Sequence, residues 1–140
     1  MTLLVDTSVW SLAFRRDGEV DRPEVEALRA ALLAGDRLVT TGVIVQELLQ
    51  GFRGPLQADR LFERLRSIAV LTPTLGDHVR AAGLRDDCRR RGVVLATIDA
   101  LLASLCVGYE LTLLTCDQDF AHAATVVPLM LWTPGDETWM

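Results

Sequence analysis

The sequence contains no lysine, because all 14 of its basic residues are arginines. This absence excludes mechanisms that depend on a lysine amine, such as Schiff-base formation or phosphate binding by a Walker A lysine. Phospho-receiver domains and haloacid-dehalogenase-type phosphatases usually need a lysine as well. The phosphatases also need an aspartate two residues after the first one, and after Asp6 that position holds Ser8. Both phosphoryl-transfer classes are therefore disfavoured.

A cysteine framework and a membrane segment are also missing. The three cysteines, Cys88, Cys106 and Cys116, are widely spaced and form no C-x-x-C motif or Cys/His cluster. A zinc site is therefore not expected, and unpaired cysteines suit a reducing compartment. The N-terminus lacks the basic segment of a signal peptide, and the longest uncharged run, residues 120–135, is too short to span a bilayer. We expect a cytoplasmic protein that does not contact membranes.

The composition is typical of one globular domain. The 140 residues are 50% hydrophobic and 24% charged, and we expect a single domain over residues 1–140. The formal net charge is −5, whereas a nucleic-acid-binding domain usually carries a basic surface. If this chain acts on nucleic acid, a local site with bound cations must hold it.

Short apolar runs alternate with longer helical patterns along the chain. Strands are expected at residues 2–5, 37–40, 68–71, 112–116 and 126–132. Helices are expected at residues 7–15, from a cap at Asp21 to Gly35, from a cap at Thr41 to Gly51, at residues 56–67, from about Asp77 to Arg91, and from a cap at Thr97 to Gly108. This alternation predicts an α/β fold whose parallel sheet is covered on both faces.

Four acidic residues are set apart because apolar or small residues surround them: Asp6, Glu47, Asp99 and Asp117. Asp6 ends the first expected strand and Asp117 ends the fourth, and ligands of open parallel sheets bind outside the carboxyl ends of the strands. Asp99 lies in the first turn of an apolar helix, and Glu47 lies among apolar residues of another. Folding is expected to carry all four toward the interior or a cleft.

Each of these acids also has a purely structural interpretation. Asp6 can cap the following helix, and Asp99 can interact with a helix dipole. Glu47 can pair with a buried arginine, and Asp117 can form a plain turn. One shared site explains all four positions at once. Clustered carboxylates repel one another, and a divalent cation that binds carboxylates, water and phosphate oxygens removes that conflict.

The segments around these acids resemble the motifs of the PIN domain, a metal-dependent nuclease fold. They are most similar to VapC-type toxins of type II toxin–antitoxin systems. The similar segments are residues 4–10 (LVDTSVW), 41–51 (TGVIVQELLQG), 97–103 (TIDALLA) and 113–120 (LLTCDQDF). They occur in the order of the family's motifs, and the resemblance covers nearly the whole chain.

The resemblance implies a three-layer α/β/α sandwich with a central, mainly parallel sheet. It also implies an endoribonuclease that depends on Mg²⁺ or Mn²⁺, forms a homodimer and is restrained by a cognate antitoxin protein. Carried over to this sequence, the catalytic residues are Asp6, Glu47, Asp99 and Asp117, and the metal ligands are Asp6, Asp99, Asp117 and Asp119. Thr7 and Thr115 are candidates for positioning waters or carboxylates.

The reaction that the resemblance implies is in-line hydrolysis of an RNA phosphodiester by a metal-activated water. Such a reaction leaves 5′-phosphate and 3′-hydroxyl ends. The alternative from a different class is a catalytically silent PIN-like module that keeps the fold in order to bind protein.

Three other features keep two interpretations each. The segment 85–91 (RDDCRRR) is either a solvated helix face or a phosphate-contacting surface near the cleft. The isolated His78 and His122 are assigned surface roles rather than ligand or base roles. A set of large apolar residues in the first half either packs in the core or lines a groove for an antitoxin helix: Trp10, Phe14, Leu48, Phe52, Leu61 and Phe62.

Overall fold

The computed structural model describes residues 1–15, 21–35, 37–52 and 54–135, and within them the chain forms five strands and seven helices. The strands are β1 (Leu3–Val5), β2 (Leu38–Thr40), β3 (Ala69–Val70), β4 (Thr112–Leu114) and β5 (Met130–Leu131). The helices are α1 (Thr7–Ala13), α2 (Pro23–Ala34), α3 (Gly42–Gly51), α4 (Pro55–Leu65), α5 (Leu75–Arg90), α6 (Thr97–Gly108) and α7 (Gln118–Ala123).

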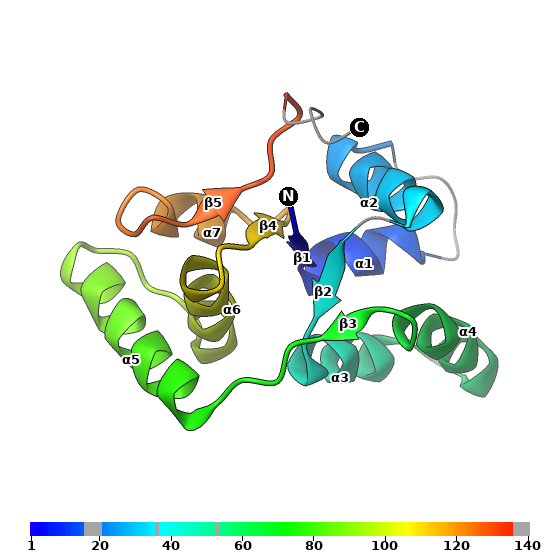
Figure 1. Ribbon diagram of the computed structural model, residues 1–140, viewed down its shortest axis with the longest axis horizontal. Coiled ribbons are helices and arrows are strands. Elements are labelled where there is room, and N and C mark those ends of the chain that lie inside the picture. Colours follow the sequence, from blue (N-terminus) through cyan, green and yellow to red (C-terminus); the bar gives the residue numbers. More distant parts are fainter. Residues whose placement is uncertain (16–20, 36, 53, 136–140) are drawn as a thin grey trace.

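The strands form one sheet in the order β3-β2-β1-β4-β5, and every strand pairing within the described residues is parallel. The chain therefore starts in the centre of the sheet, adds β2 and β3 on one side, and then adds β4 and β5 on the other. Right-handed crossovers place α1 to α4 on one face and α5 to α7 on the opposite face. Figure 1 shows this division of the helices about the strands. The expected α/β/α sandwich with a parallel sheet is confirmed.

The core fills the space between the sheet and both helical layers. All residues of β1 and β4 are buried, as expected for central strands covered on both faces. Trp10 of α1 and Phe120 of α7 are fully buried, and Trp10 stacks on Phe14 with ring centroids 5.9 Å apart. Of the large apolar residues with two interpretations, Trp10, Leu48 and Leu61 belong to this core, whereas Phe62 is 48% exposed.

One of the three expected helix caps is confirmed. The Thr41 hydroxyl accepts the backbone N–H of Ile44 at 3.3 Å at the start of α3. The cap expected at Asp21 is wrong: α2 begins at Pro23, and Arg22 is the N-cap. Proline suits the first helical position because its missing N–H has no partner there anyway, so it fixes the start of the helix one residue later than the acid would.

The helices α5 and α6 also begin elsewhere than expected. Thr97 is not the cap but the first residue of α6. The N-cap is Ala96, whose backbone is extended. α5 begins at Leu75 rather than near Asp77. The Thr74 side chain accepts the N–H of Asp77, and the Asp77 carboxylate accepts the N–H of Thr74 at 2.8 Å, which forms a capping box.

The end of the described chain differs most from the expectation. The helix α7 was not predicted, and β5 is limited to Met130–Leu131 although a strand was expected over residues 126–132. The N–H groups of Val126 and Val127 both donate to the carbonyl oxygen of Ala123, which extends the turn after α7 into the expected strand. Val126 and Val127 are β-branched and apolar, which predicted a strand, and nothing in the sequence indicated this turn.

Two expected absences concern the described part of the chain. No helix there combines the length and apolar character needed to cross a membrane. All three cysteines are free, with Cys88 and Cys106 buried and Cys116 partly buried. The described residues thus carry no disulfide.

Candidate acidic active site

Asp6 and Asp117 lie at the carboxyl ends of the two adjacent strands β1 and β4. Asp6 directly follows Val5, and its N–H donates to the carbonyl oxygen of Leu114 at 2.9 Å. The strand order reverses between β1 and β4, and a reversal of this kind opens a crevice at the carboxyl ends of the strands. The topology therefore brings together two acids that lie far apart in the sequence.

Two hydroxyl groups hold the carboxylate of Asp6. Ser8 Oγ and Thr115 Oγ1 both donate to Asp6 Oδ2, at 2.7 Å and 2.8 Å. Asp6 is only 6% exposed, and it makes no side-chain hydrogen bond to the backbone of α1 although it occupies the N-cap position. The interpretation of Asp6 as a helix cap is therefore wrong. Its Oδ1 has no hydrogen-bond partner among the described residues.

The same two hydroxyl groups fix the loop that carries Asp117. Ser8 Oγ accepts the N–H of Cys116 at 3.1 Å, and Thr115 Oγ1 accepts the N–H of Asp117 at 3.0 Å. Ser8 and Thr115 thus couple the end of β1 to the end of β4. Thr115 was predicted to position a carboxylate, whereas Ser8 was not predicted as a site residue. Its place two residues after Asp6 was the available signal.

Asp117 is the N-cap of α7. Its Oδ1 accepts the N–H of Asp119 at 2.9 Å, so the plain-turn interpretation is replaced by a helix cap. Because the cap uses one oxygen, the other carboxylate oxygen remains for a ligand. Asp117 therefore has a structural role that does not conflict with a role in the site.

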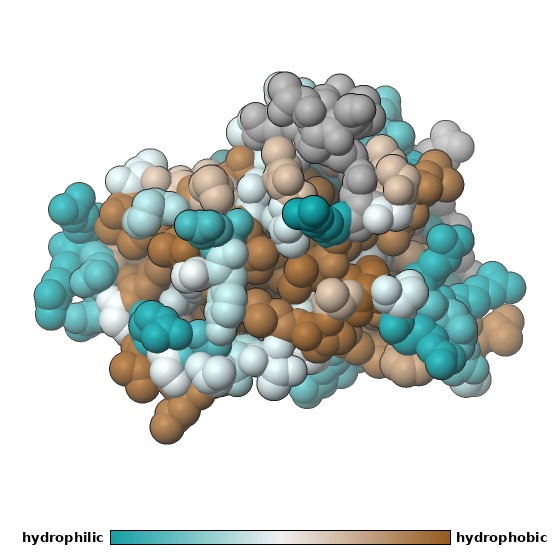
Figure 2. All heavy atoms as spheres, viewed as in Figure 1, coloured by the Kyte–Doolittle hydropathy of each residue, from teal (hydrophilic) through white to brown (hydrophobic). Residues whose placement is uncertain are grey.

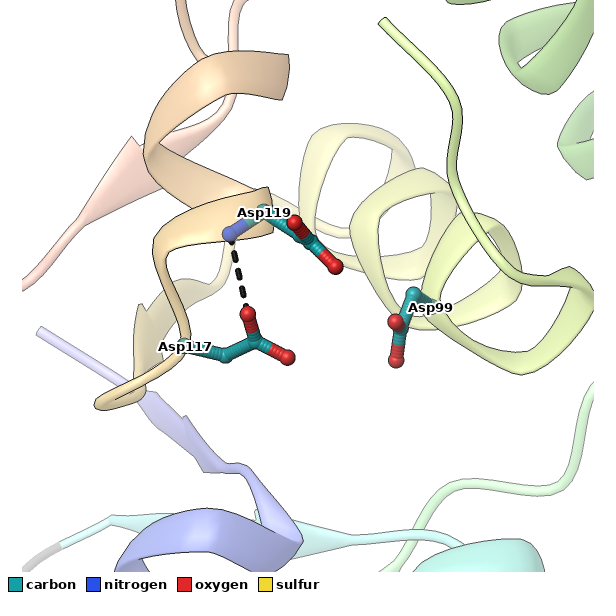
Figure 3. Close-up of side chains that lie close together, drawn as sticks. All are labelled: Asp99, Asp117 and Asp119. Atoms are coloured by element: carbon teal, nitrogen blue, oxygen red, sulfur yellow. Dashed lines mark hydrogen bonds between the residues drawn. The ribbon is translucent and has the colours of Figure 1, made fainter.

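Asp99, Asp117 and Asp119 form a compact cluster. One carboxylate oxygen from each lies within 4.8 Å of the others. Asp99 lies in the first turn of α6, and Figure 3 shows the carboxylates of Asp117 and Asp119 pointing toward that helix. The metal-ligand candidate Asp6 is not part of this group, so its role as a ligand stays a prediction.

Four of the acids lie close enough to the fifth, Asp99, to affect its pKa. Burial, the largest cause, and four nearby carboxylates together raise the pKa of Asp99 from 3.8 to about 6; the carboxylates are those of Asp6, Asp117, Asp119 and Glu47. Glu47 is partly buried in α3, and its Oε1 accepts the hydroxyl of Thr7 at 3.4 Å. Within the described residues, Glu47 has no arginine partner, and the other four acids make no ion pair either. The site carries uncompensated negative charge.

The residues present fit a divalent cation. Three carboxylate oxygens within 4.8 Å of one another form the kind of small, hard oxygen set that Mg²⁺ and Mn²⁺ prefer. No ion pair within the described residues neutralises this charge, and the carboxylates beside Asp99 add to the effect of burial in raising its pKa. The set contains no cysteine or histidine, which distinguishes it from zinc sites.

We expect the metal-free protein to lose stability as the pH rises from about 4 to about 6. The folded chain keeps a proton on Asp99 up to a pKa of about 6, whereas the unfolded chain releases it near 3.8. Asp99→Asn removes this effect and is expected to be about 1 kcal/mol more stable than the parent at pH 7, allowing for solvent around the half-buried carboxylate. Urea denaturation with a chelator measures this at pH 4 and pH 7. An equal stability difference at both pH values would contradict the prediction.

Fold and site together define a class: an α/β protein whose acidic site lies at the strand-order reversal of a parallel sheet. The family model described as the PIN domain matches residues 3–126. The chain therefore belongs to the PIN domain family, and the resemblance of its acidic motifs is confirmed. A comparison with curated proteins gives no significant match.

Solved structures share the fold over nearly their whole length. FitAcB from Neisseria gonorrhoeae matches with a TM-score of 0.71 and 23% identity, covering 96% of this chain and 99% of that one. VapBC2 from Rickettsia felis, bound to a DNA fragment from its promoter, has a TM-score of 0.74, 16% identity and coverages of 94% and 98%. VapC20 from Mycobacterium tuberculosis, a sarcin–ricin-loop-cleaving toxin, has a TM-score of 0.64, 17% identity and coverages of 91% and 98%.

Proposed function

We propose that this protein is a metal-dependent endoribonuclease and the toxin of a type II toxin–antitoxin pair. The observation that carries the proposal is the cluster of Asp99, Asp117 and Asp119, with Asp6 and Glu47 close enough to act on Asp99. Membership of the PIN domain family supports a nuclease. The toxin–antitoxin assignment is supported by structural neighbours of similar length, one of which is described as cleaving the sarcin–ricin loop.

The cofactor in this proposal is Mg²⁺ or Mn²⁺. Asp99, Asp117 and Asp119 would hold it, with Asp6 Oδ1 and Glu47 completing the acidic pocket. Such an ion supplies a Lewis acid that polarises a phosphate oxygen and lowers the pKa of water. The chain's own part is to fix the carboxylates: Ser8 and Thr115 orient Asp6, and α7 orients Asp117.

The protonation state of Asp99 determines how well the site binds the cation. While Asp99 is protonated, it can donate a hydrogen bond but binds a cation poorly. Above a pKa of about 6 it becomes a carboxylate, and the pocket then gains a full negative charge. Activity is therefore expected to rise with pH through this range and to depend on the divalent ion concentration.

The proposed partners are a cognate antitoxin and a second copy of this chain, in the cytoplasm. A groove of about 460 Å³ between α1 and α4 would take an apolar antitoxin segment, because Phe14, Phe52 and Leu61 line it. Arg15 and Arg60 also line it, which favours acidic residues in that segment.

A separate apolar surface supports the homodimer. Val70 of β3 and Leu75 and Val79 of α5 are 57%, 82% and 65% exposed. Figure 2 shows apolar residues gathered across the middle of the viewed face. Hydrophilic residues lie at its two ends, over α5 at one end and over α4 at the other. Large exposed apolar residues close together in a small protein are typical of a protein contact.

The test is to produce the protein in cells and map the new 5′ ends of RNA, with Asp6→Asn as the matched control. We expect discrete new ends that carry 5′-phosphates and are absent with Asp6→Asn, because the charge of Asp6 is lost while a similar shape remains. Ends with 2′,3′-cyclic phosphates would contradict hydrolysis by water. Folded protein that produces no new ends would favour the silent protein-binding module.

A further inference from the structure

A second hollow adjoins the acidic site across the first turn of α6. It is a groove of about 450 Å³ between α3, α5 and the start of α6. Its walls include Val43, His78, Ala82, Arg85, Ile98 and Leu101. Ile98 and Ala100 both line this groove, whereas Asp99 between them belongs to the acidic cluster. The groove and the cluster therefore share one helical turn.

Arg85 differs from the other arginines of α5. Arg80 pairs with Asp77, and Arg89 and Arg90 both pair with Asp86, at 2.6 Å and 2.8 Å. The pairs of Arg89 and Arg90 are ordinary surface ion pairs, so that part of the segment 85–91 follows the solvated-face interpretation.

Arg85 makes no ion pair within the described residues. Its Nε donates instead to the carbonyl oxygen of Leu95 at 2.8 Å, in the loop that leads into α6. This bond fixes the stem of the guanidinium group and leaves its two terminal nitrogens available. A pre-oriented, unpaired arginine of this kind suits a phosphate group.

The groove combines this cation with an apolar floor. Ala82 on α5 is exposed, and Ile98 on α6 is 37% exposed. His78, Ala82 and Arg85 are spaced so that they lie on one face of α5. This face adjoins the one that carries Leu75 and Val79, the apolar surface assigned to the homodimer, because Leu75, His78 and Ala82 are themselves at helical spacing.

We propose, building on the proposed ribonuclease function, that this groove binds an unpaired nucleotide of the RNA next to the cleaved bond. Its base lies against Ala82 and Ile98, and its phosphate lies at Arg85. Two observations favour this occupant. The groove and the acidic cluster share the first turn of α6, and Arg85 supplies the positive charge that a phosphate needs beside a strongly acidic centre.

The first experiment compares Arg85→Gln with Arg89→Gln on an RNA oligonucleotide that spans one mapped cleavage site. Arg85→Gln is expected to lower kcat/KM roughly 10-fold, chiefly through KM, and to reduce the slope of log kcat/KM against log salt by about 0.7. Arg89→Gln removes a charge of the same sign one turn further along α5 and is expected to change neither quantity by more than about 2-fold.

The second experiment tests the base contact with Ala82→Leu, which fills the groove. In the parent, an abasic nucleotide at one position beside the cleaved bond is expected to lower kcat/KM roughly 10-fold. Ala82→Leu is expected to lose a similar factor on the intact oligonucleotide and nothing more on the abasic one. Equal abasic effects in the parent and in Ala82→Leu would overturn the base contact.

The outcomes separate this inference from the function on which it rests. If the parent cleaves the oligonucleotide and Arg85→Gln cleaves it with the same KM and salt slope, the groove assignment is wrong and the ribonuclease function stands. If the parent cleaves no RNA, both are wrong. If Arg85→Gln or Ala82→Leu changes the sedimentation of the protein, the groove is a contact between copies of the chain, and the nucleotide assignment is overturned.

Discussion

Asp117→Asn is expected to lower RNA cleavage by at least about 100-fold while the protein stays folded. Asparagine keeps the Oδ1 that accepts the N–H of Asp119, so the cap of α7 survives. What is lost is one negative charge and one good metal ligand in a cluster whose oxygens lie within 4.8 Å of one another. The measurement is kcat/KM with Mg²⁺ or Mn²⁺, together with the rise in melting temperature that Mn²⁺ produces.

Two companion variants sharpen this experiment. Asp117→Ala removes the cap as well, so it is expected to lose the same activity and about 1 kcal/mol of stability in addition. Asp87→Asn removes an equal charge from an exposed position on α5 and is expected to retain activity. If Asp117→Asn kept both its activity and its stabilisation by Mn²⁺, the assignment of this carboxylate to the metal would be wrong.

Phe120→Ala is expected to lower the free energy of unfolding by about 3 to 5 kcal/mol. Phe120 is fully buried and anchors the six-residue helix α7, which is too short to be stable by itself. Urea denaturation measures the loss. Phe120→Leu fills most of the space and is expected to lose less than about half as much.

The same variant connects the core to the site. Asp117 is the N-cap of α7, and Asp119 lies in its first turn. Mn²⁺ bound to these carboxylates binds only the folded state, so it is expected to restore part of the stability lost in Phe120→Ala. Such a recovery should be absent when Asp117→Asn is combined with Phe120→Ala. Equal recovery in the single and double variants would show that the ion binds elsewhere.

The sequence predicted the architecture because central strands leave a strong pattern. Leu3–Val5 is a short apolar run followed directly by Asp6, and Thr112–Leu114 is a short, mostly apolar run with Asp117 three residues beyond its end. Both are buried parallel strands. The position of Asp6 and Asp117 at one edge then followed from the rule for parallel sheets. The order of the strands needed the structure, since the pattern of one strand does not identify its neighbours.

The errors in the predicted secondary structure concern short segments and the exact residues at which helices begin. α7 spans six residues and has one fully buried aromatic residue, which is too little periodicity for a helix to be recognised. Pro23 and the extended Ala96 moved two helix starts by one or two residues. In the site, the bond from Ser8 to the carboxylate of Asp6 spans only two residues, so that part of its role had a local signal. The bond that Ser8 accepts from the N–H of Cys116, 108 residues away in the sequence, had none.

The central position of β1 has a consequence for the timing of synthesis. Asp6 is translated 109 residues before its partner Thr115. At roughly 5 to 20 residues per second, Asp6 waits about 5 to 20 s for the strand and loop that complete its surroundings. A nascent chain therefore has no assembled acidic site until β4 and the loop with Thr115 and Asp117 have also been translated. The topology itself delays any RNA cleavage until β4 has joined β1.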